Sequence, residues 1–188
     1  DALPISWSLW WLDKNDANAL TGKTDAGSAI TYPISLKSYV IAEDAGLYPN
    51  RRLPSTYGLN YYIQDVRFTT VIGLNKNSKS TNAIDGEFTV IEPYGVTLVD
   101  ALIEHSSNSG TTYTSNPYML ELNFTGYDDA GRPIGPGNAH VFRKRFPIKL
   151  LDCKISVTGK GAEYKFRFVP TGGGEAHSEE LRTLPKSV

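Results

Sequence analysis

Alternating hydrophobic and polar residues are the main signal along this chain, and the clearest run spans residues 118–125. Its hydrophobic members are Tyr118, Leu120, Leu122 and Phe124, and they alternate with Met119, Glu121, Asn123 and Thr125. A period of two predicts a strand with one buried face and one polar face. Similar runs predict further strands at 34–42, 61–72, 87–92, 141–147, 151–158 and 164–168.

The run at 61–72 predicts a long strand with two distinct faces. One face would carry Tyr62, Val66, Phe68 and Ile72, and the other would carry Asp65, Arg67 and Thr69. A polar stretch at 73–86 follows, which is longer than most hairpin loops. Such a loop is typical either of a functional contact or of a mobile connection.

One helix is predicted, beginning near Thr97. Thr97 and Asp100 have the spacing of an N-terminal capping box. The hydrophobic residues after them recur at helical spacing, and they are Leu98, Val99, Leu102 and Ile103. A polar segment at 106–110 ends the pattern. A single amphipathic helix among strands is expected to cover one face or end of a sheet.

A β-hairpin is predicted around the turn at 158–161, because alternating runs approach it from both sides. Cys153 lies on the hydrophobic face of the first run, so we interpret it as a packing residue rather than a reactive thiol. It is the only cysteine, which excludes an internal disulfide.

The first 12 residues are rich in tryptophan and allow two interpretations. Trp7, Trp10 and Trp11 could belong to a strand in the chain's own sheet or to an arm that reaches a neighbouring subunit. Residues 13–31 have no periodicity and are expected to form a loop. We therefore divide the chain into an N-terminal arm and polar loop (1–33), a β domain (34–170) and a C-terminal linker or the start of a further region (171–188).

Composition narrows the functional classes. The formal net charge of −1 argues against binding nucleic acid through bulk electrostatics. No hydrophobic run is long enough to span a bilayer, so no membrane insertion is expected. The three histidines lack zinc-site spacing, and no nucleophile elbow or phosphate-binding loop is present. We predict no catalytic residue, metal ligand or cofactor. The charged segment 43–54 is either a docking loop or a solvated connection.

Four segments together resemble virion structural proteins of tailed bacteriophages, of the baseplate-hub and tail-tube kind. They are IEPYGVTL at 91–98, NPYMLELNFTGYD at 116–128, FPIKL at 146–150 and GAEYKFRFVP at 161–170. The resemblance covers about 34–170. It implies a mainly β domain, a β-sandwich or half-barrel of the tail-tube-like kind, with one short flanking α-helix.

The resemblance also implies a function. Copies of the chain would form a ring, as a trimer or hexamer, around the channel through which DNA is ejected, and they would join the tube to other tail or baseplate proteins. The protein would be assembled in the host cytoplasm and located in the virion, and it would not be an enzyme. DNA would be only a passing partner. The expected subunit-interface residues are Trp10, Trp11, Arg51, Arg52, Lys76, Lys79, Arg143, Lys144 and Arg145.

For the channel lining, we expect polar side chains from the Asp65–Thr69 and Glu121–Thr125 faces, with the helix at 97–105 outside. Two other functions stay open. Abundant tyrosine and tryptophan favour a carbohydrate- or receptor-binding β-sandwich, in which Trp10 or Trp11 would contact the glycan. A tail-associated hydrolase would need carboxylates such as Glu43 or Asp129.

Overall fold

The computed structural model describes residues 5–20, 37–44, 50, 52–53, 60–71, 83–124 and 142–171. These contain seven strands and two helices, in the order β1 (Ile5–Trp11), α1 (Lys14–Leu20), β2 (Tyr39–Glu43), β3 (Tyr62–Val71), β4 (Ala83–Glu92), α2 (Leu98–Asn108), β5 (Tyr118–Phe124), β6 (Phe142–Thr158) and β7 (Gly161–Pro170). The strands form one antiparallel sheet in the order β2-β1-β5-β6-β7-β4-β3.

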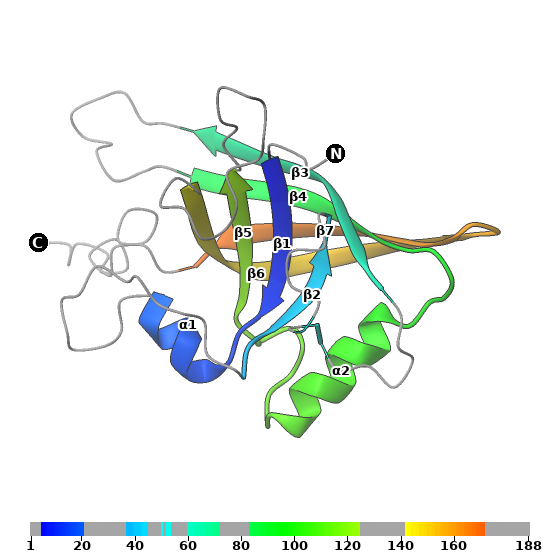
Figure 1. Ribbon diagram of the computed structural model, residues 1–188, viewed down its shortest axis with the longest axis horizontal. Coiled ribbons are helices and arrows are strands. Elements are labelled where there is room, and N and C mark those ends of the chain that lie inside the picture. The colour runs from blue at the N-terminus through cyan, green and yellow to red at the C-terminus, as the bar shows by residue number, and fades with distance from the viewer. Residues whose placement is uncertain are drawn as a thin grey trace, which may run out of the picture.

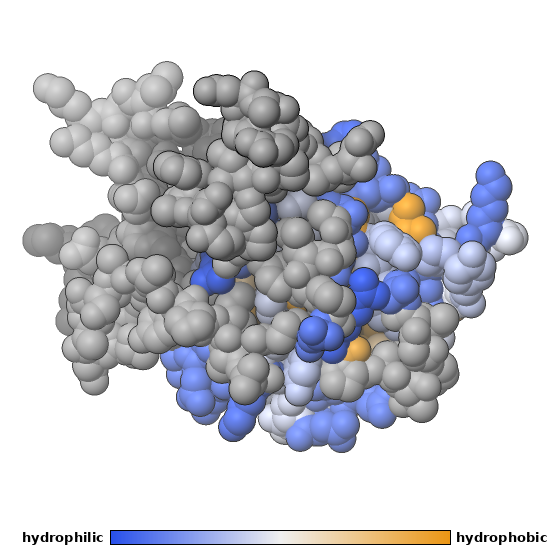
Figure 2. Space-filling view, viewed as in Figure 1, coloured by the Kyte–Doolittle hydropathy of each residue, from blue (hydrophilic) through white to orange (hydrophobic). Residues whose placement is uncertain are grey.

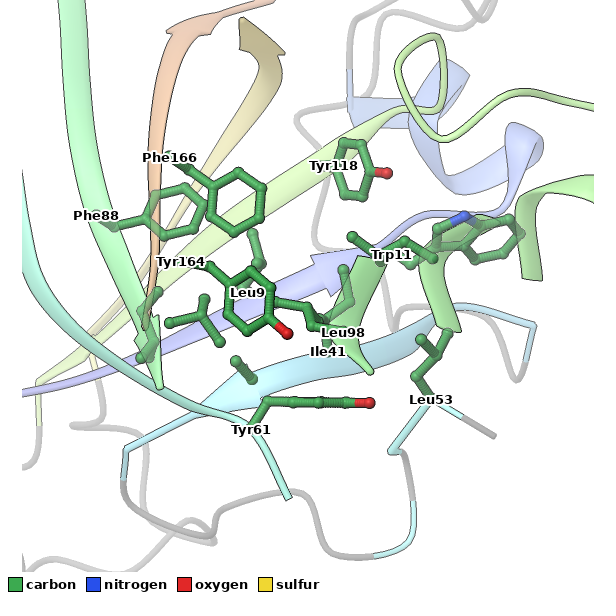
Figure 3. Packing of buried hydrophobic residues seen from close by; sticks show 14 of the residues in the cluster. Leu9, Trp11, Ile41, Leu53, Tyr61, Phe88, Leu98, Tyr118, Tyr164 and Phe166 are labelled. Carbon is green, nitrogen blue, oxygen red and sulfur yellow. The ribbon is translucent and has the colours of Figure 1, made fainter. Parts of the chain in front are cut away.

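The sheet curls into a half-barrel, which confirms the predicted mainly β fold (Figure 1). Its two edge strands, β2 and β3, approach each other where β2 ends. There the Glu43 amide donates a hydrogen bond of 3.4 Å to the carbonyl of Tyr61, the residue just before β3. The main core fills the concave side and includes Tyr61, Phe88, Tyr164 and Phe168. Figure 3 shows this packing, with Tyr61 and Tyr164 turning their hydroxyl groups to the same side near Leu98.

The first strand belongs to the chain's own sheet, so the arm interpretation of residues 1–12 does not hold for the described part. β1 lies between β2 and β5, and its register with β5 runs from Ile5 opposite Phe124 to Trp11 opposite Tyr118. The loop expected at 13–31 begins instead with helix α1, where Ser38 donates a hydrogen bond to Asp16. A helix of seven residues is too short to give a clear hydrophobic period, which explains why the sequence pattern missed it.

Two β-bulges shift the alternation that the sequence pattern followed. In β3 the register slips between Gln64 and Arg67, where Asp65 has a φ of 53°. The core side chain before the bulge is therefore Ile63, and Tyr62 is exposed, contrary to the predicted face. Past the bulge, Phe68 returns to the core as predicted.

The second bulge lies in β6, between Leu150 and Asp152. The predicted strands 141–147 and 151–158 are one continuous strand of 17 residues. The bulge explains why core-facing positions change from even numbers, such as Ile148, to odd numbers, such as Cys153 and Ile155. The predicted hairpin turn is confirmed, because Thr158 pairs with Gly161.

The expected channel lining on β5 is wrong. Glu121 and Asn123 are 0% and 2% exposed, because β5 is a central strand that is buried on both faces. The Glu121 carboxylate accepts a 2.7 Å bond from Nε of Arg145 on β6 and a 3.3 Å bond from Nδ2 of Asn123. These contacts explain how a charged residue is accommodated there. Thr125 lies outside the described residues.

Helix α2 is capped by Glu92 and not by the predicted box, because Thr97 makes no side-chain cap bond. The Glu92 side chain is 1% exposed and accepts bonds from the Thr97 amide (2.8 Å), the Thr97 hydroxyl (2.7 Å) and the Leu98 amide (3.1 Å). The Tyr164 hydroxyl of β7 donates a further bond of 2.8 Å. The helix dipole also favours a negative charge at this end.

The beginning of β7 fits against the same corner. Gly161 has a φ of +123°, and a Cβ atom at this position would lie 2.2 Å from the Glu92 carbonyl oxygen. Only glycine allows this approach and this backbone conformation together. The pKa of the Tyr164 hydroxyl is raised by burial and then by its bond to the Glu92 carboxylate, so the hydroxyl stays protonated and able to donate.

We predict that Glu92→Gln lowers the free energy of unfolding by about 3 kcal/mol, because the amide group would turn a donor toward donors that now share one buried carboxylate. Asp100→Asn is the matched control, since it makes the same chemical change on an exposed side chain in the first turn of α2. It should cost less than about 0.5 kcal/mol. Urea unfolding followed by tryptophan fluorescence measures both values, and equal losses would contradict the role of Glu92.

Candidate interaction surface

Strand β6 extends well past its neighbour β5. It pairs with β5 only through Phe142–Ile148, whereas it pairs with β7 from Ile148 to Thr158. Within the described residues, the stretch from Asp152 to Thr158 has no partner strand on its second side. The hairpin of β6 and β7 therefore projects from the barrel, beside α2 (Figure 1). We call Asp152–Thr158 the free edge.

Large hydrophobic side chains are exposed along this projection. Leu151, Ile155 and Val157 are 51%, 50% and 59% exposed. Ile155 and Val157 lie opposite Tyr164 and Ala162 of β7, so they continue the core-facing side of the sheet beyond the point where the core ends. In Figure 2 a few hydrophobic side chains show between hydrophilic ones toward this end of the molecule.

A groove of about 210 Å³ lies between the hairpin and α2. Its walls are mostly hydrophobic, with Val99 and Leu102 from α2 and Cys153, Ile155 and Phe166 from the hairpin. Tyr113, from the loop that leads to β5, lines one end and is 37% exposed. An exposed edge beside a hydrophobic groove is a typical place for another chain to bind.

The opposite side of the hairpin carries charges of both signs. A row of four charged residues crosses the sheet in direct register, one on each of β3, β4, β7 and β6. In that order they are Arg67, Glu87, Arg167 and Asp152, and we call this row the charge ladder. Glu87 lies 3.8 Å from Arg67 and 3.2 Å from Lys165, and Arg167 donates a 2.6 Å bond to Asp152. The Arg167 bond is the main cause that lowers the pKa of Asp152.

Three lysines on the hairpin are exposed and form no ion pair with a described carboxylate: Lys149, Lys154 and Lys160. From residue 149 to 170 the sequence has five basic and two acidic side chains. The projection is therefore basic although the whole chain is nearly neutral.

Four of the nine predicted interface residues are buried in this chain or paired with its own side chains. Trp10 and Trp11 are 1% and 4% exposed and fill the two core clusters, so they offer no surface to a neighbour or a glycan. Arg52 lies 3.3 Å from Glu43, a carboxylate that is 5% exposed. Glu43 is also one of the two carboxylates suggested for a hydrolase, and here it is paired with Arg52. The other carboxylate, Asp129, lies outside the described residues.

Of the six remaining predicted residues, Lys144 and Arg145 have side chains that the structure describes. Lys144 is exposed, with its Nζ atom 5.2 Å from the centre of the Phe146 ring, and Arg145 is occupied by Glu121. Arg143 stands opposite Asn123 in the β5–β6 register, but its side chain is not among those described. Arg51, Lys76 and Lys79 lie outside the described residues.

Sequence reasoning missed the exposed hydrophobic side chains because it treated a hydrophobic alternation as a buried one. The run from Leu151 to Val157 was recognised, and Cys153 was correctly placed on its hydrophobic face. Among the described residues no strand covers the edge of this run, and this depends on how far β5 reaches along β6. The sequence signal that could have shown this is the difference in length between the runs that form β5 and β6. The bulge in β6 divides its run in two and hides the difference.

A second hollow, of about 440 Å³, lies beside α1. Trp11, Leu12, Ala17 and Pro117 form its hydrophobic part, and Asp13, Lys14 and several hydroxyl and amide side chains form its rim. It contains no histidine or cysteine side chain. Over the described residues, no three histidine, cysteine or acidic side chains come close enough to hold a metal ion. None of the described helices has the length and hydrophobicity to cross a membrane.

No family model, curated protein or solved structure matches the chain. The surface formed by the free edge, the groove and the charge ladder is therefore the main guide to function.

Cys153 provides a test of the groove. Burial is the main cause that raises the pKa of its thiol to about 11. We predict that iodoacetamide reacts at least tenfold more slowly at about pH 8 with the folded chain than with the urea-unfolded chain, because the thiolate is the nucleophile. The rate in the folded chain should rise about tenfold per pH unit to about pH 10. Equal rates for folded and unfolded chains would show that the thiol is not in this environment.

His105 of α2 packs edge-on against Trp11 and Tyr39, at 4.3 and 5.1 Å between ring centres. Burial lowers its pKa below the ordinary 6.5. As the pH falls through 6.5, the unfolded chain therefore binds a proton that the folded chain does not, and stability decreases. We predict that the free energy of unfolding falls between about pH 7.5 and about pH 5.5, and that His105→Gln removes part of this dependence. Urea titrations at both pH values measure it; identical pH dependence in the two chains would contradict the assignment.

Proposed function

We propose that this chain is a structural component of a bacteriophage tail or baseplate hub, where copies form a ring around the DNA-ejection channel and join the tube to other tail proteins. The observation that carries the proposal is the projecting hairpin with its free edge and exposed hydrophobic side chains. The resemblance of four segments to tail-tube-like proteins gives the specific setting.

The hairpin supports an assembly role on energetic grounds. Leu151, Ile155 and Val157 each keep about half of their surface exposed. Covering that surface with another protein would contribute roughly 1 kcal/mol for each side chain. A strand edge without a partner among the described residues also offers backbone hydrogen bonds to an added strand. This surface supports the joining part of the proposal, in which another tail protein covers the hairpin, and the ring contacts between copies lie elsewhere on the chain.

The charge ladder supports the proposed channel. The expected channel lining on β5 is wrong, because Glu121 and Asn123 are buried. On β3, however, Asp65, Arg67 and Thr69 are exposed, so this part of the expected lining is retained in the proposal. Across the sheet, the positive charges of the ladder stand beside negative ones. A lining with balanced charges would let DNA pass, because tight phosphate binding requires an excess of lysine and arginine.

We predict that native particles containing the chain show three or six copies coaxial with a tube. Native mass spectrometry of the released ring would then give three or six times the mass of one subunit, as measured for the denatured protein from the same particles. The measurement combines that mass with class averages from electron microscopy, which report the rotational symmetry. A single unassembled chain in its native particle or extract would overturn the proposal.

A further inference from the structure

We propose that the free edge of β6 docks an extended strand of a different protein, in which aliphatic residues alternate with acidic ones. The inference rests on the proposed function only in treating the chain as part of an assembly. It adds the chemistry of the partner, which the ring proposal does not specify.

The backbone supplies the first part of the recognition. Asp152–Thr158 is seven residues long and, over the described chain, pairs only with β7. A fully paired segment of this length spans roughly 23 Å. An added strand would gain main-chain hydrogen bonds along that length, as in other complexes that extend a sheet.

The hydrophobic side chains supply the second part. Cys153, Ile155 and Val157 all lie on the concave side of the sheet, and Cys153 and Ile155 line the groove under α2. Every second residue of an added strand would point to this side. Aliphatic side chains at those positions would fill the groove and cover Ile155 and Val157.

The lysines determine the remaining positions. Lys154 is in the middle of the free edge, on the opposite side of the sheet, and stands directly across from Lys165 of β7. Like charges in that arrangement are unfavourable, and Lys165 already has Glu87 as its partner. An acidic residue on the added strand would give Lys154 a cross-strand partner, with Lys149 and Lys160 adding attraction at the two ends.

The same charges argue against a second copy of this chain as the occupant. Pairing two free edges would bring together two hairpins that each carry five basic and only two acidic side chains. Lysines on an exposed edge are also a common protection against pairing between identical sheets. An acidic strand meets no such repulsion.

The test uses two capped nine-residue peptides, one alternating glutamate with valine and the other alternating lysine with valine. Fluorescence anisotropy with the full chain measures both affinities. We expect the acidic peptide to bind with a Kd of about 100 μM or tighter, and the basic peptide at least about tenfold more weakly. Lys154→Glu should weaken the acidic peptide about tenfold and strengthen the basic one. Lys14→Glu, the same exchange on an exposed lysine of α1, should change neither.

The single cysteine locates the binding site. A saturating amount of the acidic peptide should slow alkylation of Cys153 at about pH 9 at least threefold, and Ile155→Asp should abolish both this protection and the binding. Both substituted positions on β6 are exposed, and thermal unfolding of each variant checks that it folds.

Each of four results would overturn the inference. Two concern affinity: equal affinities for the two peptides, or no binding at about 1 mM. The third is an unchanged alkylation rate of Cys153 at saturation, and the fourth is a doubling of mass that Ile155→Asp removes, which would identify a second copy as the occupant. The peptide test needs no ring. If the chain forms rings but does not bind the acidic peptide, only the docking site is refuted. If the chain is a monomer that binds the acidic peptide, only the ring is refuted.

Discussion

The buried carboxylate of Glu92 is the interaction on which the arrangement of the other elements depends. It ends β4, caps α2 through Thr97 and Leu98, and receives the hydroxyl of Tyr164 from β7. A carboxylate that is 1% exposed is costly to bury, and these four donated bonds, with the helix dipole, offset that cost. Because one side chain joins two strands and a helix, the direction of α2 is fixed relative to the hairpin, and Gly161 lets the hairpin approach the same corner.

The exposed surface follows from this fixed arrangement and from strand lengths. Helix α2 covers the core-facing side of the hairpin only as far as Leu102 and Val99 reach. Beyond that point β6 continues without β5, because β5 has seven residues and β6 has 17. The face of β6 that buries Ile148 in the barrel continues past the bulge with Ile155 and Val157, which are left in contact with solvent. Their exposure is a property of the topology and not of an unusual sequence.

The sequence predicted most of the strands, the main helix and the hairpin because these depend on local periodicity, but it left β1 open between a strand and an arm and divided β6 in two. It failed where the outcome depends on distant partners. Glu121 is polar in an alternating run, and only the position of β5 between β1 and β6, with Arg145 opposite, determines that it is buried. The cap is a similar case, since Glu92 lies five residues before Thr97 and matches no capping motif. The bulges at Asp65 and Leu151 change the face of later residues without a residue type that marks them.

Two places depart from the usual distribution of side chains, in which charged groups are exposed and hydrophobic ones are buried. One side of the sheet buries the ion pair of Glu121 and Arg145, whereas the projection exposes Ile155 and Val157. A buried pair of this kind contributes little to net stability, but it disfavours alternative registers, because a shift would leave a charge unpaired. The half-barrel therefore has a well-defined register where it is closed, and where β6 extends past β5 its edge has no partner strand among the described residues. A rigid support for an incomplete edge is the arrangement that binding an added strand requires, since the entropy of ordering the edge is already lost in folding.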